Sequence, residues 1–261
     1  SFIMATAPAN NLPLFYGDIV PLSSVDHADF HARPLAEAKF LVGQHAIPLT
    51  SDEFTSACRF YPIIFSAGEN PVPLALMGLN EGVNVFVDDE GKLLNPVYVP
   101  AYIRRYPFLL ARLNPGSEEL SLCFDPTSGA VGKFDEGDAL FVDGQPSEQT
   151  KAVLDFCRNF EEAGQRTGML VDELKKADLL MDGEVAIQPD GSDKPFVYRG
   201  FQMVDENKLR ELRGDVLRKL MQNGTLPLIY AHLLSLQLMR DIFAEQVKAG
   251  KVPAMTDAPV A

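Results

Sequence analysis

The sequence is short of cysteine, of basic residues and of long apolar runs, and each shortage excludes a class of protein. Its three cysteines, Cys58, Cys123 and Cys157, lie far apart and form no Cys-x-x-Cys pair. They therefore predict reduced core thiols rather than a disulfide framework or a zinc site. Lys and Arg number 23 against 36 Asp and Glu, which gives a net charge of −13. Because this charge repels phosphate backbones, no nucleic-acid binding is expected.

No apolar run approaches the roughly 20 residues that cross a bilayer. The richest stretch, 226–239, contains His232, and its length predicts a buried core helix rather than membrane insertion. The N-terminus has no charged segment followed by an apolar one, as a secretory signal peptide would have. We therefore expect a soluble, cytoplasmic protein, and secretion by a route that reads no N-terminal signal stays open.

The motifs of several large enzyme classes are also missing. The chain has no Gly-x-Gly-x-x-Gly that opens a helix, no Walker loop, no Gly-x-Ser-x-Gly elbow and no His-Glu-x-x-His. Its acidic runs at 88–90 and 135–138 do not have the twelve-residue spacing of a calcium loop. The motifs therefore name no catalytic residue and no cofactor, and leave open whether the chain is an enzyme.

The first 145 residues consist of short apolar segments separated by turn residues. This pattern predicts strands, which include 63–65, 74–79, 83–87, 108–113 and 120–124. Thr50 and Glu53 lie three positions apart and predict a capping box at the start of a short helix. That helix should end before Tyr61-Pro62, because a residue that precedes proline avoids the helical conformation.

The rest of the chain predicts helices. Ser147 should cap a helix that runs past Phe160 and is loosened by Gly164 and Gly168, and Asp205 should cap a second one over 206–221. A last helix is expected over 227–247, antiparallel to its predecessor because their connection is short. The predicted fold class is α+β: a mostly antiparallel β-sheet from the first 145 residues, packed against C-terminal helices that include this antiparallel pair.

No linker rich in Pro, Ser or Gly divides the chain, so a single domain is expected over 12–249. The ends, 1–11 and 250–261, are expected to be flexible. Residues 1–3 precede Met4, the first plausible initiator, and are expected to be foreign to the natural chain.

An internal echo joins two parts of the chain. Tyr61-Pro62 leads into an apolar segment that is followed by Phe86-Val87-Asp88, and Tyr106-Pro107 leads into one that is followed by Phe141-Val142-Asp143. A duplicated β unit explains this pattern, and so does the fact that β-hairpins draw on few residue types. The two spacings differ, whereas repeats usually keep a fixed period.

His27 and Asp29 have the His-x-Asp spacing of a facial iron triad, with His45 or His232 as the distal ligand. On a strand, residues two apart point to the same side, so both could face one metal. The segment is polar, however, so a pair of solvated loop residues is the default interpretation.

Two further features are candidates for a ligand site. His232 and Ser235 lie three residues apart in the most apolar helix, as a structural histidine or as a group that contacts a ligand or moves a proton. Tyr102, Arg104, Arg105 and Tyr106 form the densest aromatic and cationic cluster. Because adjacent helical residues point about 100° apart, one arginine is expected to pair with an acidic neighbour and the other to meet solvent.

Several blocks together resemble the SapC family of bacterial proteins. They are 61–65, 74–79, 84–87, 98–108 and 231–236, and the most specific is Tyr-Val-Pro-Ala-Tyr-Ile-Arg-Arg-Tyr-Pro-Phe at 98–108. The likeness extends over about 20–245. It implies an association with a bacterial surface layer and supplies no catalytic residue.

Two hypotheses follow. The first is a non-catalytic binding or assembly protein, accessory to a bacterial surface or uptake system, with a protein partner or a second copy bound to it. The second is a small-ligand-binding protein or enzyme with a pocket near Tyr102, Arg104, Arg105 and His232, metal-dependent if His27 and Asp29 hold iron.

Overall fold

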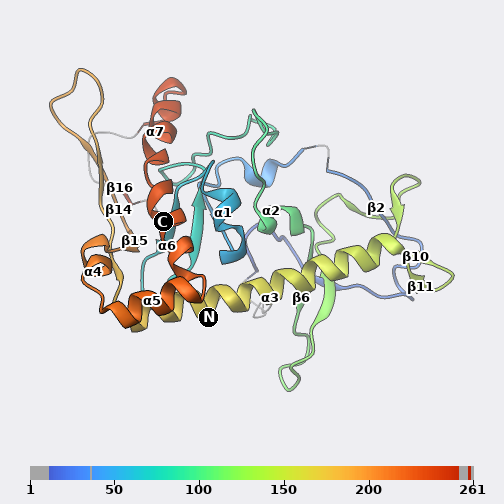
Figure 1. Ribbon diagram of the computed structural model, residues 1–261. Coiled ribbons are helices and arrows are strands. Elements are labelled where there is room, and N and C mark those ends of the chain that lie inside the picture. The colour runs from blue at the N-terminus through green and yellow to red at the C-terminus, as the bar shows by residue number, and fades with distance from the viewer. Residues whose placement is uncertain (1–11, 36, 253–257, 260–261) are drawn as a thin grey trace. The chain divides into compact units, whose positions relative to one another are not determined.

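The computed structural model describes residues 12–35, 37–252 and 258–259 (Figure 1). The chain divides into two compact units, Lys39–Pro100 with Arg166–Ala261 and Phe2–Ala38 with Ala101–Gln165. We call them the large and the small unit and describe each by itself, and the single domain over 12–249 stays a prediction. The ends expected to be flexible lie mostly outside the described residues, but Ala258–Pro259 forms a strand, β16.

A five-stranded sheet lies at the centre of the large unit, and all its strand pairs are antiparallel. Its apolar strands β4 and β5 are largely buried, which agrees with their central position. Two of its strands, β12 and β15, come from the second half of the chain, so distant segments build this sheet together. In sheet order the strands are β12 (Leu180–Asp182), β15 (Phe201–Val204), β4 (Ile63–Ser66), β5 (Pro73–Leu76) and β3 (Ala46–Pro48).

A smaller sheet completes the strands of the large unit. Strand β14 (Phe196–Arg199) pairs antiparallel with β13 (Val185–Ile187) and parallel with β16. Short helical segments precede β4: η1 (Lys39–Leu41), and η2 (Ser51–Glu53), which continues into α1 (Phe54–Ala57). Thr50 and Glu53 form the predicted capping box at the start of η2.

Four helices stand where the sequence predicted two. They are α4 (Glu206–Arg210), α5 (Gly214–Gln222), α6 (Thr225–Ser235) and α7 (Leu238–Lys248). Asp205 caps α4 as predicted, by accepting hydrogen bonds from two backbone N–H groups. The helix ends at Arg210, and Arg213, whose ψ of 144° is not helical, separates it from α5. Figure 1 shows α6 turning away from α5 after Gly224, whose φ of 83° only glycine adopts readily.

The break between α6 and α7 has a local cause. The hydroxyl of Ser235 donates a hydrogen bond of 2.6 Å to the backbone carbonyl of His232, one turn earlier. Such a bond competes with the helical ladder and bends helices. Beyond the bend, α7 buries Met239, Ile242 and Phe243 in a core that includes Tyr198. Among the described helices, none combines the length and the apolar character that crossing a bilayer demands.

The small unit is built from short strands. Three-stranded sheets form in the orders β1-β7-β6 and β8-β2-β9, and β10 pairs with β11 in a hairpin. Every pair is antiparallel. The strands are β1 (Val20–Pro21), β2 (His31–Ala32), β6 (Phe108–Ala111), β7 (Ser121–Phe124), β8 (Val131–Gly132), β9 (Asp138–Ala139), β10 (Phe141–Val142) and β11 (Gln145–Pro146).

Two helices belong to this part of the chain. Helix α2 (Ala101–Arg105) lies directly before β6, and α3 (Glu148–Lys176) begins in the small unit and ends in the large one. Ser147 caps α3, because its hydroxyl accepts a hydrogen bond from the N–H of Thr150. The helix runs on through Gly164 and Gly168, so the prediction that these glycines loosen it was wrong. The fold class is α+β, as predicted.

The two copies of the internal echo fall in different units. After Tyr61-Pro62 comes β4, a strand inside the five-stranded sheet, whereas after Tyr106-Pro107 comes β6, an edge strand of a three-stranded sheet. The two strands thus differ in their pairing, and a duplication stays a hypothesis.

Candidate functional site

Arg105 lies inside an aromatic cage in the small unit. Its side chain is 0% exposed. Its guanidinium carbon lies 4.5 Å from the ring centre of Phe160, 4.8 Å from that of Tyr102 and 5.6 Å from that of Tyr16. Cation–π contacts of desolvated groups contribute on the order of 2 kcal/mol each. The cage therefore fastens α2 to α3 and to the segment around Tyr16.

Glu161 is the anionic partner of this cage. Its Oε1 lies 3.8 Å from Nη1 of Arg105, and its side chain is 15% exposed. Burial raises the pKa of Glu161 to about 7, although the charge of Arg105 acts in the opposite direction. Burial likewise raises the pKa of Tyr16 and of Tyr102. The pair thus joins two groups whose charges are removed from water.

Arg104, the neighbouring arginine, has a different environment. It is exposed, and its guanidinium carbon lies 5.3 Å from the ring centre of Phe156. One arginine thus pairs with an acidic residue and the other reaches solvent, which confirms the prediction made from helical geometry.

Asp125 organises the residues beside the cage. Its Oδ2 accepts hydrogen bonds from the N–H of Gly17 at 2.7 Å and from the hydroxyl of Tyr106 at 2.9 Å. Its Oδ1 accepts two more, from the N–H and the hydroxyl of Thr127, at 2.8 and 2.6 Å. Burial acts to raise the pKa of Asp125, but these bonds outweigh it and the pKa is lowered. This carboxylate ties together the segment at Gly17, the residue that follows α2 and the turn that follows β7.

His232 is fully buried in the large unit, where it joins α6 to the central sheet. Its Nδ1 lies 2.6 Å from the carbonyl oxygen of Ile63 in β4, and its Nε2 accepts a hydrogen bond of 3.1 Å from the N–H of Val204 in β15. Burial lowers the pKa of His232 to about 4, although the bond to Ile63 acts to raise it. The ring is therefore neutral, with its proton on Nδ1. Ser235 adds a third link, since its hydroxyl accepts a bond of 2.8 Å from the N–H of Ile63.

Both ring nitrogens of His232 are thus occupied by the backbone, the arrangement of a structural histidine. The four predicted site residues are divided between the units: Tyr102, Arg104 and Arg105 lie in the small unit and His232 in the large one. Tyr102 and Arg105 are in contact, while Arg104 points elsewhere.

His27 and Asp29, the predicted metal pair, have separate partners. Nδ1 of His27 accepts a hydrogen bond of 2.9 Å from the N–H of Ser23, and its ring packs edge-on against Phe124. Asp29 lies 3.7 Å from the Nζ of Lys133. Within the described residues, no group of three or more His, Cys, Asp and Glu side chains is placed to hold a metal ion. Iron binding by this pair stays a prediction.

The cysteines are free thiols in the structure. Cys123 and Cys157 are buried, and burial raises the pKa of Cys123 to about 11 and that of Cys157 to about 12. Cys58 is partly exposed, and its thiol donates to the carbonyl of Thr55. The two buried cysteines are the core thiols that the sequence predicted.

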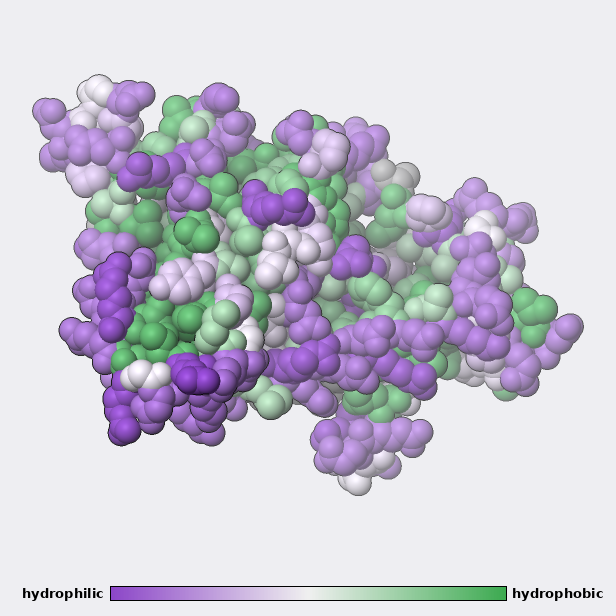
Figure 2. Space-filling view, in the orientation of Figure 1, coloured by the Kyte–Doolittle hydropathy of each residue, from purple (hydrophilic) through white to green (hydrophobic). Residues whose placement is uncertain are grey.

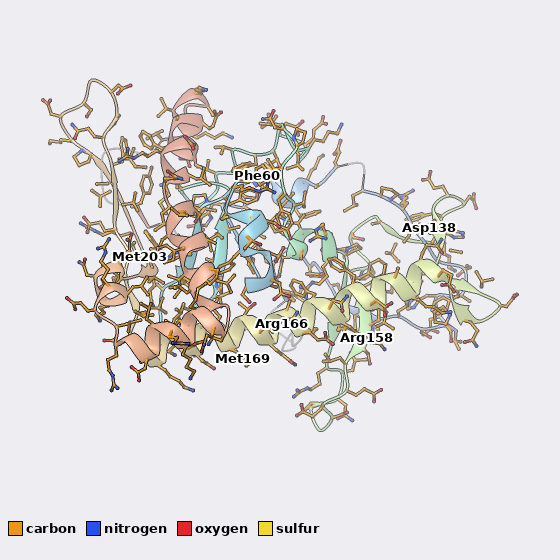
Figure 3. The ribbon with its side chains drawn as sticks, viewed as in Figure 1. Phe60, Asp138, Arg158, Arg166, Met169 and Met203 are labelled. Atoms are coloured by element: carbon orange, nitrogen blue, oxygen red, sulfur yellow. The ribbon has the colours of Figure 1, made fainter. Side chains whose placement is uncertain are left out.

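Two grooves of the large unit are lined by residues that the sequence did not mark as site candidates. The first, the α3–α6 groove, has a volume of 430 Å³ and includes Met169, Leu170 and Leu228 among its lining. Met169, which projects from α3 in Figure 3, is 70% exposed. Figure 2 shows apolar surface in the neighbouring area of α5 and α6.

The second, the α7 groove, has a volume of 310 Å³. One wall is a face of α7, and the other is formed by Arg59, Phe60 and the segment around Phe86 and Leu94. Phe60 is labelled in Figure 3. Residues Leu238, Asp241, Ile242 and Glu245 line the groove at helical spacing, a signal present in the sequence once α7 is recognised as a separate helix.

The family model named SapC matches residues 22–242. The chain belongs to the SapC family. This match covers most of both units and confirms the resemblance that the Tyr-Pro blocks indicated. Neither the search of curated proteins nor the search of solved structures found a match.

Proposed function

We propose that this SapC chain is a non-catalytic binding protein that docks an amphipathic helix of a partner protein in its α3–α6 groove, as an accessory of a bacterial surface or uptake system. The observation that carries the proposal is the exposure of Met169, at 70%, beside the half-buried Leu228 in a groove of 430 Å³. Methionine side chains adapt to apolar partners, and helices commonly dock in grooves of this kind.

The walls of this groove are held in place from both sides. Arg166 of α3 forms two hydrogen bonds with the carboxylate of Asp52, at 3.1 and 2.6 Å. Glu173, two turns further along α3, accepts hydrogen bonds from the amide of Asn223 at 2.7 Å and from the hydroxyl of Thr225 at 2.9 Å. A groove that is already formed loses less conformational entropy when a partner binds.

The net charge favours a partner protein over a second copy. Two copies of a chain with a charge of −13 repel each other, whereas a basic helix is attracted to it and a neutral helix is not repelled. The polar rim of Asp52, Arg166 and Glu173 offers both signs of charge to the flanks of such a helix.

The alternative, a pocket shared by Tyr102, Arg104, Arg105 and His232, has less support. The Arg105 side chain is 0% exposed and faces aromatic rings, and His232 is bonded to two strands. Both arrangements stabilise the fold and hold these side chains away from solvent.

Site-specific crosslinking tests the proposal. A photoreactive amino acid placed at Met169 should capture one partner protein in cells of the source organism, and the same group at Met181, which is 41% exposed on β12, should not. Met169→Glu should abolish co-purification of that partner, and Met181→Glu should not. A crosslink between two copies of the chain, or equal capture from both positions, would contradict the proposal.

A further inference from the structure

We infer that the α7 groove of the large unit binds a small zwitterionic ligand with apolar side chains, of the class of hydrophobic amino acids and short peptides. This site is separate from the α3–α6 groove, because the residues that line the two grooves are different. The inference rests on the size of the groove, its apolar base and the opposite charges on its two walls.

The base of the groove is apolar and anchored in the core. Ile242 is buried, and Leu238 and Phe86 are half-buried. The ring of Phe86 packs on that of Tyr61, with 4.8 Å between their centres, and Tyr61 is fully buried. A volume of 310 Å³ is at the lower end of the range of roughly 300–1,000 Å³ that small-molecule sites occupy. The groove therefore suits a ligand of the size of an amino acid or dipeptide.

The wall formed by α7 is anionic. Asp241 and Glu245 are exposed, line the groove and lie one helical turn apart, a like-charge spacing that costs helix stability. Glu245 lies 3.3 Å from the Nζ of Lys248. Asp241 forms no ion pair or side-chain hydrogen bond with another residue of the described chain. Its carboxylate is thus open to an ammonium group.

The opposite wall is cationic. Arg59 is exposed, and its guanidinium carbon lies 5.5 Å from the ring centre of Phe60. Across the residues that the structure describes, Arg59 forms no ion pair with an acidic side chain. A guanidinium binds a carboxylate through two parallel hydrogen bonds. A ligand that spans the groove thus meets a cation on one wall and an anion on the other.

Hydrophobic amino acids and short peptides match this arrangement. Their carboxylate suits Arg59, their ammonium suits Asp241, and their apolar side chains cover Leu238 and Ile242. A fatty acid has no cationic group for the α7 wall, and an alkylamine has no anionic group for Arg59. Charge complementarity on both walls therefore selects a zwitterion.

Calorimetric titration of the full chain with leucyl-leucine tests the inference. We expect binding that weakens at least tenfold with N-acetyl-leucyl-leucine, which has no ammonium, and with leucyl-leucine amide, which has no carboxylate. Arg59→Gln should weaken the binding of leucyl-leucine about tenfold and leave that of the amide unchanged. Asp241→Asn should weaken the binding of leucyl-leucine likewise and leave that of the N-acetyl compound unchanged.

Two control variants accompany these measurements. Arg240→Gln changes an exposed arginine of α7 that does not line this groove, and Met169→Glu changes the α3–α6 groove. Both should bind leucyl-leucine like the wild-type chain. The test of the α7 groove therefore does not depend on whether the α3–α6 groove binds a partner protein. The inference is overturned if leucyl-leucine does not bind, if the two blocked compounds bind as tightly, or if Arg59→Gln and Asp241→Asn have no effect.

Discussion

Acid should destabilise the large unit through the protonation of His232. Burial lowers the pKa of this side chain from 6.5 to about 4. Between these values the imidazole of the unfolded chain is protonated and that of the folded chain is neutral. Because the unfolded state then binds more protons, the free energy of unfolding decreases as the pH falls through this window.

The shift sets the size of the effect. One pKa unit corresponds to about 1.4 kcal/mol, so the change from 6.5 to about 4 corresponds to about 3 kcal/mol of stability. This contribution is fully present above pH 6.5 and is lost below about pH 4. Because domains are stable by roughly 5–15 kcal/mol in all, the loss should be readily measured.

Urea unfolding at a series of pH values, followed by circular dichroism because the chain has no tryptophan, measures this effect. The comparison is between the wild-type chain and His232→Gln, whose amide does not titrate. Both proteins should also contain Glu161→Gln, because Glu161 titrates with the opposite sign. Their free energies of unfolding should converge by about 3 kcal/mol as the pH falls.

A difference between the wild-type chain and His232→Gln that stays constant from pH 7.5 to pH 4 would refute the reasoning, because it would mean that the folded and unfolded imidazoles titrate alike.

Three further predictions concern the buried polar groups. The pKa of Glu161 is raised from 4.5 to about 7, so the folded state binds more protons than the unfolded state between these values. The wild-type chain should therefore gain stability relative to Glu161→Gln as the pH falls from 7 to 4.5. The same urea series measures this, with exposed Glu162→Gln as the control, and a stability difference that does not change with pH would contradict it. Ser235→Ala leaves the buried N–H of Ile63 without its acceptor and should cost about 1–3 kcal/mol in urea unfolding, against no change for exposed Ser24→Ala. Asp125→Ala removes the acceptor of four hydrogen bonds and should lower the free energy of unfolding by more than 3 kcal/mol at pH 7, and a loss like that of exposed Asp135→Ala would contradict this assignment.

Local signals in the sequence were reliable wherever neighbouring residues decide the structure. The capping box of Thr50 and Glu53, the N-caps Ser147 and Asp205, and the divergence of Arg104 from Arg105 all follow from residues within one helical turn of each other. The α+β class follows from the same kind of pattern, since apolar alternation and helical spacing are local properties.

The candidate sites depended on long-range contacts, which no local pattern contains. The sequence predicted a ligand site at the tyrosines and arginines of 102–106. In the structure, Phe160 and Glu161 of α3 enclose Arg105 instead. The α7 groove joins residues that are far apart in the chain, since α7 lines one part of it and Arg59, Phe60 and Phe86 line another.

By itself, then, the sequence determined the family, the α+β fold class, the capped starts of α3 and α4 and the net charge of −13, because composition and spacing along the chain are enough for these. The tertiary structure alone decided which polar groups are buried and which line a groove. His232 shows the reason. Its ring is neutral and hydrogen-bonded because of Ile63 in β4 and Val204 in β15, and these two strands are far apart in the chain and become neighbours only when the central sheet forms.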